Sequence, residues 1–480
     1  MICALGRAFI QFHLVDACHD VKGKIKTMAQ EFFAEIAAKR QELEQAAQLA
    51  VQLARQAGAD ECEAVIGAAR GIEVSTRHQS VENVEFNQDR SLGVVVFKGK
   101  RRGSASTTDL SPSSIAESIN AALGLARDTD PDPYAGLCDK ELLCTKADDF
   151  DLLQELHASP DEGIQMAAAT EEAALSVGDK RIKDSDGAYF ASEVRTRVIA
   201  TSADFCISNV STSHSFGLTL IGQEEDRMQR GSGFGLACKY EDLPPINTVA
   251  HEALERTCGR LGAFKPKSGR YNIIFTDNAA RSLWGHLKEA ISGYNIYLKS
   301  SFMCDKLGQQ ILPDFITLHE EPLLRGKLGS RCCDGEGAAC YAQDWVQAGV
   351  LQEYLLSSYT ARRLQMKTNA HSGGFATLMV QSDAAHTRTL PEMMREVGEG
   401  LVIDSLMGQG VDIVSGNYSR GASGFYFKNG ERVQAVHELT VAADLKELYA
   451  QIALLGNDYD PRYKLLSGSI LVPDLTVSGA

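Results

Sequence analysis

Two residues that can ligate a metal, His286 and Glu289, lie three positions apart in the segment SLWGHLKEAISGYNIYLKSSF, residues 282–302. On a helix this spacing places both side chains on one face, so a cation could be held between them. A catalytic zinc site, however, takes three protein ligands and leaves one position for water. The further candidates are Cys304, which lies beyond the helix, and His371, which is distant in sequence. The alternative is a surface histidine beside a surface glutamate with no ion between them.

Four side chains are candidates for contact with a peptide in a cleft, namely His286 and three others. His371 precedes two glycines in NAHSGG, where the backbone could approach a peptide closely, and the alternative is an exposed loop histidine. Tyr418 and Arg420 lie in the glycine-rich segment SGNYSRGASGF, residues 415–425. That segment fits either pairing with an extended peptide by β-addition or tight packing within a β-rich domain.

The cysteines do not form a recognisable metal or disulfide pattern. The chain has 12 of them without a C-x-x-C pair, and none follows Cys340, so the sequence predicts neither a zinc ribbon nor a disulfide framework. Cys332 and Cys333 lie closest to Cys340, and we interpret all three as buried or loop thiols rather than as a metal or redox site. Free thiols fit a reducing compartment, so we expect a cytoplasmic protein.

Charge and hydropathy exclude several classes of partner. The net charge is -15, and the only compact basic cluster, GKRRG at 99–103, fits the end of a hairpin, so we expect no direct contact with nucleic acid. The segment GSGFG at 231–235 lacks the Lys-Ser/Thr ending of a phosphate loop. No apolar run reaches the ~20 residues that span a bilayer, so we expect no membrane insertion. Residues 1–27 lack the basic start of a secretory signal and are expected to be an N-terminal extension.

The elements that must position these residues follow from hydrophobic periodicity. A helix is predicted from Phe32 to Ala57. Four strands of a meander follow it, at 61–69, 72–78, 80–86 and 92–100, with a turn at NQDRS (87–91) between the last two. A second helix begins at Pro112, with Ser111 as its N-cap.

The same order of elements occurs a second time after a linker rich in Asp and Pro at 128–140. A helix begins at Pro160, with Ser159 as N-cap and Glu162 completing a capping box. Four strands and a closing helix are predicted next, at 188–203, 205–213, 216–223, 234–240 and 246–261. The order of helix, four strands and helix therefore occurs twice, as an architectural repeat.

From Gly269 onward, glycine-punctuated strands predict a mostly antiparallel β-rich domain with a few helices, and Asn429-Gly430 predicts a tight hairpin turn. The whole chain is therefore expected to be α+β, with two helix/four-strand modules followed by this domain. We expect four parts: an extension at 1–27, a first module at 28–127, a central module at 145–262 and a C-terminal domain at 268–480.

The segment that carries His286 and Glu289 is itself predicted to be helical. Asp277 can cap a helix running through NAARSLWGHLKEAIS. On a regular helix the apolar side chains would then point inward, namely Leu283, Leu287, Ala290 and Ile291.

Several longer motifs together resemble the PmbA branch, also called TldE, of the TldD/PmbA family. They are STRHQSVENVEFN, GSASTTDLSP, SSYTARRL, LVIDSLMGQGVDIVSGNYSRGASGFYFKNGE and LLGND, and the resemblance covers the chain from about Met28 to Gly479. It implies three parts, which agree with the boundaries above. It also implies a heterodimeric zinc protease in which a TldD subunit supplies the metal site and the PmbA subunit supplies none. The implied substrates are unfolded peptides, including a microcin leader and an antitoxin, and the older family name implies modulation of DNA gyrase.

The resemblance also locates the missing metal site. The TldD pattern is H-E-x-x-x-H with a later cysteine after GND, and its Glu acts as the general base on metal-bound water. Aligned on the following Gly and Ser-Ser-Phe, Trp284 stands at the first His, Gly285 at the Glu and Glu289 at the second His. The segment after GND contains no cysteine. Of these residues only Glu289 retains ligand chemistry, and His286 falls between the ligand positions.

The resemblance therefore implies a subunit that binds no metal and needs no cofactor, because zinc is expected only in a TldD-like partner. Such a chain would be inactive alone, and homodimers are plausible when the partner is missing. Two alternatives stay open. One is a self-sufficient metallopeptidase that uses His286, Glu289 and a third ligand such as His371. The other is a regulatory protein that acts on gyrase or a toxin system without proteolysis.

Overall fold

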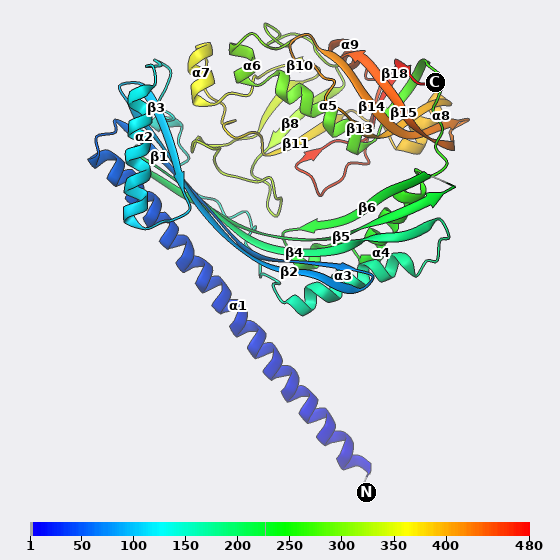
Figure 1. Cartoon of the computed structure of the whole chain (residues 1–480), viewed down its shortest axis with the longest axis horizontal. Helices are drawn as coiled ribbons and strands as arrows, with labels where there is room; N and C mark the ends of the chain where they lie inside the picture. Colours follow the sequence, from blue (N-terminus) through cyan, green and yellow to red (C-terminus); the bar gives the residue numbers. More distant parts are fainter. Residues whose placement is uncertain (1–2, 226) are drawn as a thin grey trace.

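The computed structural model describes residues 3–225 and 227–480, with side-chain surroundings from Gln30 onward. The first half of the chain forms one curved antiparallel sheet of six strands in the order β3-β2-β1-β4-β5-β6 (Figure 1). The strands are β1 (Glu61–Arg77), β2 (Ser80–Lys98), β3 (Arg101–Thr107), β4 (Ile182–Thr201), β5 (Phe205–Glu224) and β6 (Arg227–Ala237). The helices are α1 (Cys3–Gln56), α2 (Pro112–Asp128), α3 (Pro160–Leu175) and α4 (Ile246–Cys258).

Each half of this sheet contains three strands, so the prediction of four per module is wrong, although the repeat of helix, strands and helix is confirmed. The predicted turn at 87–91 lies inside β2, where Asn87–Ser91 pair with Gly67–Gly71 of β1. The actual turn is at His78 and Gln79, which both have positive φ, of 50° and 60°. The predicted strands at 205–213 and 216–223 likewise form the single long strand β5.

The helix ends agree with the local sequence patterns. Ser111 caps α2 by accepting from the backbone of Ser114, and Ser159 caps α3 by accepting from the backbone of Glu162. The Glu162 carboxylate lies 3.6 Å from His157, so only half of the predicted capping box is formed. Helix α1 ends one residue before the predicted Ala57 and begins before the predicted start. The N-terminal extension predicted at residues 1–27 stays a prediction, because residues 1 and 2 and the side-chain surroundings of residues 3–29 lie outside the described part of the chain.

The two faces of the curved sheet differ in character. On one face, alternate apolar side chains of β1 such as Ile66 and Val74 are buried under the four helices. The opposite face is turned toward the C-terminal part of the chain (Figure 1) and carries small polar residues, including Ser211, Ser213 and Ser215 on β5. This alternation explains why the strand prediction failed, because polar residues within a strand were taken for turns.

The C-terminal part contains two further sheets, one of seven strands in the order β12-β16-β18-β15-β14-β13-β7 and one of five in the order β10-β9-β8-β11-β17. Strand β7 pairs with both β13 and β18, which closes five strands into a ring. The strands are β7 (Gly269–Phe275), β8 (Ile316–Glu321), β9 (Gln343–Gln347), β10 (Val350–Leu351), β11 (Thr377–Ser382), β12 (Thr387–Arg388), β13 (Glu399–Met407), β14 (Asn417–Lys428), β15 (Glu431–Asp444), β16 (Leu454–Gly456), β17 (Leu465–Leu466) and β18 (Ile470–Ser478). The helices are α5 (Asp277–Ala290), α6 (Gly293–Tyr297), α7 (Ser358–Leu364), α8 (Leu390–Val397) and α9 (Leu445–Ala450).

The predicted α+β class, with mostly antiparallel sheets and a few helices in the C-terminal part, is confirmed. Asn429 and Gly430 form the predicted turn between β14 and β15, both with positive φ. The basic segment 99–103 spans the turn between β2 and β3, and the segment 231–235 lies inside β6 rather than between a strand and a helix. Within the described ranges no helix combines the length and the apolar character that crossing a membrane requires.

Candidate functional site

Helix α5 carries the residues that the sequence singled out. Leu283, Trp284, Leu287 and Ala290 are buried on one side of it, as the regular-helix prediction requires, and the next residue, Ile291, is buried as well. The predicted cap is displaced by one residue, because Thr276 occupies the N-cap position without a side-chain hydrogen bond. Asp277 is the first helical residue, and its carboxylate accepts from Arg281 at 2.7 Å.

Trp284 is held in the core by its indole nitrogen and its ring. The Nε1 atom donates to Ser467 Oγ at 2.8 Å, and the Ser467 hydroxyl in turn donates to the carbonyl of Gly468. The indole ring stacks on Tyr449 with a centroid distance of 6.1 Å. Ser467 lies after the Gly456–Asp458 segment in sequence, so this hydrogen bond joins the two stretches in which the resemblance places the metal ligands of a TldD subunit.

These residues do not fit a zinc ion. Indole Nε1 only donates hydrogen bonds, and Gly285 has no side chain. An added Cβ at Gly285 would meet no atom within 4 Å, so the glycine faces open space rather than a packed neighbour. Glu289 is exposed, and among the described residues no three His, Cys, Asp or Glu side chains are grouped as metal ligands would be.

His286 lies instead in a polar cluster with two of the predicted cleft residues. Its Nε2 is 3.4 Å from Ser282 Oγ, which also accepts from Arg420 Nη1 at 2.7 Å. The ring of Tyr418 meets the imidazole edge to face, with centroids 6.1 Å apart. Burial, together with the positive charge of Arg420, lowers the pKa of His286 to about 4, so the imidazole is neutral near pH 7.

Tyr418 and Arg420 belong to strand β14, which is paired along β15 on one side and along β13 and the segment 410–412 on the other. A peptide cannot therefore add to this strand, and the β-addition hypothesis for it is wrong. Tyr418 is 2% exposed, and its hydroxyl has no hydrogen-bond partner in the described part of the chain. Packing, the other alternative, accounts for the Tyr418 side chain.

His371 does not join the α5 cluster. Its Nε2 pairs with the Glu320 carboxylate at 2.7 Å and its Nδ1 lies 2.9 Å from Asn369 Oδ1, with the side chain almost fully buried. Glu320 also accepts from Trp345 Nε1 and from the backbone of Ala376. His371 therefore ties its loop to β8 and is neither an exposed histidine nor a ligand beside His286 and Glu289.

The three neighbouring cysteines lie at the contact between the linker and the C-terminal part. Cys332 is buried, Cys333 and Cys340 are partly buried, and the ten cysteines whose side chains the structure describes are free. Cys332 and Cys333 pack in one apolar cluster with Cys144, which lies between α2 and α3, and burial raises the pKa of Cys340 to about 12. The arrangement agrees with the interpretation of these residues as packed thiols.

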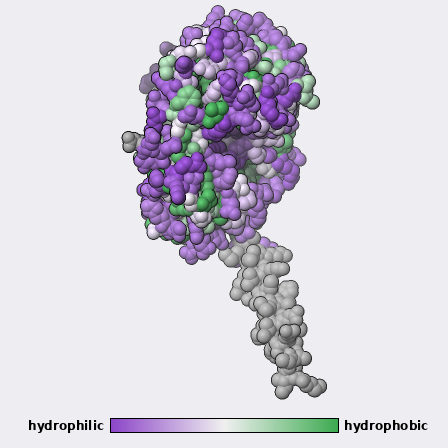
Figure 2. Space-filling view, turned by 90° about the vertical axis from the view of Figure 1, so that its right-hand side faces the viewer, coloured by the Kyte–Doolittle hydropathy of each residue, from purple (hydrophilic) through white to green (hydrophobic). Residues whose placement is uncertain are grey.

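A cleft of about 990 Å³ was not predicted. It lies where β6 and α4 meet the C-terminal loop 458–464, and it is also lined by Asp277, the first residue of α5. In the side view of Figure 2 the mostly hydrophilic surface is hollowed between the C-terminal part and the sheet. Leu328 and Tyr463 supply partly exposed apolar surface to its wall.

Arg462 fixes the cleft by joining its two sides. Its Nη2 donates to Glu252 of α4 at 2.8 Å and to Asp460 at 2.6 Å, and its guanidinium lies 4.0 Å from the ring centre of Phe234 on β6. Asp460 is two positions from Arg462, but Glu252 and Phe234 are 210 and 228 positions away, so local sequence patterns could not reveal these two partners.

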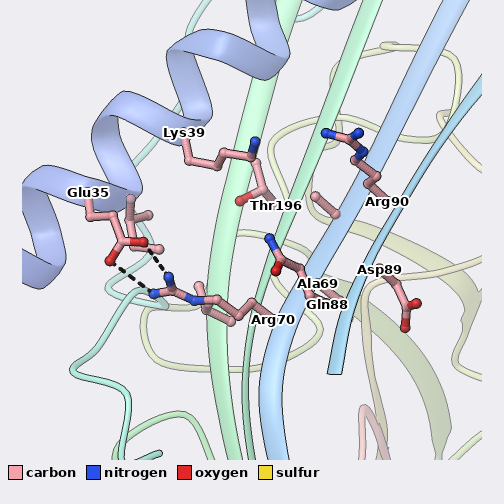
Figure 3. Close-up of a pocket in the computed structure, with 11 residues that line it drawn as sticks. Glu35, Lys39, Ala69, Arg70, Gln88, Asp89, Arg90 and Thr196 are labelled. Atoms are coloured by element: carbon pink, nitrogen blue, oxygen red, sulfur yellow. Dashed lines mark hydrogen bonds and ion pairs between the residues drawn. The ribbon is translucent and has the colours of Figure 1, made fainter. Parts of the chain in front are cut away.

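A second cavity, of about 530 Å³, lies on the helix-covered side of the sheet between α1 and strands β1, β2 and β4 (Figure 3). Figure 3 shows Glu35 of α1 paired with Arg70 of β1, with Gln88, Asp89 and Arg90 of β2 along the opposite wall. The cavity is separated by the sheet from α5, so it is not part of the α5 site.

The comparisons with known proteins agree with this architecture. Residues 62–126, 154–261 and 268–479 match the first, central and C-terminal domains described as PmbA/TldA metallopeptidase. The chain is 40% identical over 452 residues to the metalloprotease PmbA of Escherichia coli O157:H7, which covers 94% of this chain and 99% of that protein. The chain belongs to the PmbA branch of the TldD/PmbA family.

Two solved structures have the same fold as this PmbA-branch chain. A proposed modulator of DNA gyrase from Bacteroides thetaiotaomicron has a TM-score of 0.85 at 23% identity and covers 92% of this chain and 99% of its own. TldE from Thermococcus kodakarensis has a TM-score of 0.78 at 18% identity and covers 90% of this chain and 100% of its own. At these identities the likeness establishes the fold and not the activity.

Proposed function

We propose that this PmbA-branch protein is the metal-free subunit of a heterodimeric zinc protease that cleaves unfolded peptides, with a TldD-like chain as its catalytic partner. In this assignment the chain contributes part of the surface that binds the peptide, while the partner chain polarises the scissile peptide bond. We also propose the three-part division at 28–127, 145–262 and 268–480 and a cytoplasmic location, which the free thiols support.

The observation that carries the proposal is the hydrogen bond between Trp284 and Ser467. A buried indole fills the place where the TldD pattern has its first histidine, and its partner is a hydroxyl in the segment where that pattern has its cysteine. A water nucleophile needs a metal or a base beside the substrate, and this pair supplies neither. The neighbouring Gly285 cannot take a proton, so the hydrolytic chemistry is assigned to another chain.

The cleft beside α5 supports a role in binding peptides. It combines partly exposed apolar residues, Leu328 and Tyr463, with carboxylates and with the positive charges of Lys327 and Lys464. A peptide without tertiary structure offers both its apolar side chains and its unpaired backbone groups to such a surface. A folded protein keeps these groups internal, so the surface favours unfolded substrates.

The test measures zinc and peptidase activity in three samples: the chain alone, a TldD-type chain alone, and the two mixed. We expect less than stoichiometric zinc and no cleavage from the chain alone, and cleavage from the mixture. The matched control is a mixture in which the TldD-type chain has its catalytic glutamate changed to glutamine. Stoichiometric zinc together with cleavage by the chain alone would overturn the proposal.

The same samples address the self-sufficient metallopeptidase. That hypothesis requires His286, Glu289 and His371 to ligate one metal ion. Both ring nitrogens of His371, however, are already hydrogen-bonded in the core, to Glu320 and Asn369. If it held, Glu289→Gln would abolish activity in the chain alone. The description of a structural relative as a gyrase modulator keeps a regulatory role as the second candidate. An effect on gyrase that persists with the inactive TldD-type control would favour that role.

A further inference from the structure

Arg420 of β14 carries a positive charge that no carboxylate of the described residues balances. It takes part in no ion pair with them, and its one side-chain hydrogen bond runs from Nη1 to Ser282 Oγ at 2.7 Å. Its Nε is buried and has no hydrogen-bond partner in the same part of the chain. A guanidinium has five N–H donors, so four donors of Arg420 are unused.

Two other arginines, at or beside the cleft, are paired with carboxylates. Arg281 lies 2.7 Å from Asp277, and Arg462 lies 2.8 Å and 2.6 Å from two carboxylates. Arg420 is partly buried, yet it lacks such a partner among the described residues. A charge that is removed from water without a counter-ion costs free energy. An anion that comes from outside the chain would remove this cost.

The groups around Arg420 are neutral and include several hydrogen-bond donors. Ser282 and His286 lie one turn apart on α5, and the Ser282 hydroxyl is 3.4 Å from His286 Nε2. The Tyr418 hydroxyl is buried and finds no partner among the described residues. Burial and the charge of Arg420 lower the pKa of His286, and burial raises the pKa of Tyr418, so both are uncharged near pH 7. The cluster therefore combines one positive charge with donors that can bind an anion.

The cluster lies on the helix that borders the cleft, and one side of that helix is open. The ring of Tyr463, in the cleft wall, has its centre 3.6 Å from the guanidinium of Arg281, and Ser282 is the next residue of α5. An added Cβ at Gly285, the residue before His286, would meet no atom within 4 Å. A group of a peptide in the cleft can therefore approach this side of α5.

We propose that Arg420, together with Ser282 and His286, binds a carboxylate of the peptide substrate. The carboxylate belongs either to the C-terminus of the peptide or to an aspartate or glutamate side chain within it. A guanidinium matches a carboxylate through two parallel hydrogen bonds. The Ser282 hydroxyl accepts from Arg420, so its own proton is available for the same carboxylate. This inference rests on the proposed function, because it specifies which peptides the chain binds most tightly.

The test measures peptide binding to the chain alone by fluorescence anisotropy. It uses three unstructured peptides of Ala, Gly, Leu and Ser that carry the same label at the N-terminus. The first has a free C-terminal carboxylate, the second has a C-terminal amide, and the third has the amide and one internal glutamate. We expect the first or the third to bind about tenfold more tightly than the second. Preference for the first identifies a terminal carboxylate as the ligand, and preference for the third identifies an acidic side chain.

Variants of Arg420 test whether this residue causes the preference. Arg420→Gln should remove it, so that all three peptides bind with the same affinity. Arg420→Lys keeps the charge but loses the paired donors, so it should retain only part of the preference. Arg270→Gln, which removes an exposed arginine outside the cleft, is the matched control and should retain all of it. Circular dichroism and denaturant unfolding verify that each variant folds.

Equal binding of the three peptides by the unchanged chain would overturn the inference, as would a preference that persists in Arg420→Gln. Both outcomes leave the proposed function to the zinc and cleavage measurements. A chain that binds none of the peptides would also overturn the inference, while cleavage by the mixture would still decide the proposed function. If Arg420→Gln leaves every peptide affinity unchanged but weakens binding of a TldD-type chain, the carboxylate belongs to that partner and the assignment to the peptide is wrong.

Discussion

Trp284 and Ser467 lie 183 positions apart in sequence, yet the indole of one donates a 2.8 Å hydrogen bond to the hydroxyl of the other in the core. The bond joins α5 to the segment that follows the Gly456–Asp458 motif. Both groups are buried, so each would lose a partner if the other were removed. The place that the family pattern gives to a metal is thus part of the packed interior.

Trp284→Ala should destabilise the chain by about 3–5 kcal/mol, because it leaves a large cavity against Tyr449 and removes the hydrogen bond that the Ser467 hydroxyl accepts. Trp284→Phe keeps most of the packing and should cost less. Denaturant unfolding at pH 7 measures both free energies. An alanine variant as stable as the unchanged chain would show that the indole does not stabilise the core by packing.

The stability of the chain should fall as the pH drops from about 6.5 to about 4, because His286 has a pKa of about 4 in the folded chain and about 6.5 when unfolded. The unfolded chain binds the extra proton in that window, so acid favours unfolding. His286→Gln should reduce the loss of stability between pH 7 and pH 5. His251→Gln is the control, since that side chain is 69% exposed. An unchanged pH dependence in His286→Gln would contradict the expected pKa of His286.

Glu320→Gln should cost about 3–5 kcal/mol at pH 7, because it breaks a buried pair and leaves His371 without its anion. Burial alone would raise the pKa of Glu320, but the hydrogen bond and charge of His371 and the other donors lower it overall. The stabilisation is therefore present above the ordinary pKa of 4.5 and is lost as the pH falls through the lower folded value. The variant should lack this acid transition in unfolding measured as a function of pH. Glu321→Gln, on the same strand but partly exposed, should cost less than about 1 kcal/mol.

Arg462→Ala should weaken peptide binding in the mixed protease, because it disconnects α4 from the loop that forms the other wall of the cleft. We expect KM to rise by about tenfold with little change in kcat, as for a residue that shapes a binding surface without touching the reacting atoms. Steady-state kinetics of the mixture measure both constants. Arg270→Ala, which removes an exposed ion pair with Asp474 outside the cleft, is the control. An unchanged KM in Arg462→Ala would remove the cleft from the proposed peptide surface.

Features fixed by neighbours in sequence were predicted well. Ser111 and Ser159 cap their helices, Asn429 and Gly430 form their turn, and the buried side of α5 includes Leu283 and Leu287 as expected. Each of these depends on the conformational preferences of a few adjacent residues, so the local pattern is sufficient.

Features that depend on distant partners could not be predicted in this way. Asn87 and Gln88 have the composition of a turn, but pairing with β1 holds them in a strand whose two faces are both partly exposed. The environment of His371 depends on Glu320, 51 positions away, and nothing beside NAHSGG indicates it. The site on α5 was located by resemblance to the family. The hydrogen bond between Trp284 and Ser467 could be found only in the folded structure, because these residues are 183 positions apart.

The ladder between β1 and β4 has a mechanical consequence. It pairs Glu63–Thr76 with Ala188–Thr201 without interruption and so joins the two halves of the six-stranded sheet. The only covalent connection between these halves is the segment between α2 and β4. A protease cut within residues 129–139 would sever the covalent path but leave this ladder intact. The two fragments should therefore stay associated under native conditions and separate only in denaturant, because the backbone hydrogen bonds between β1 and β4 still join them.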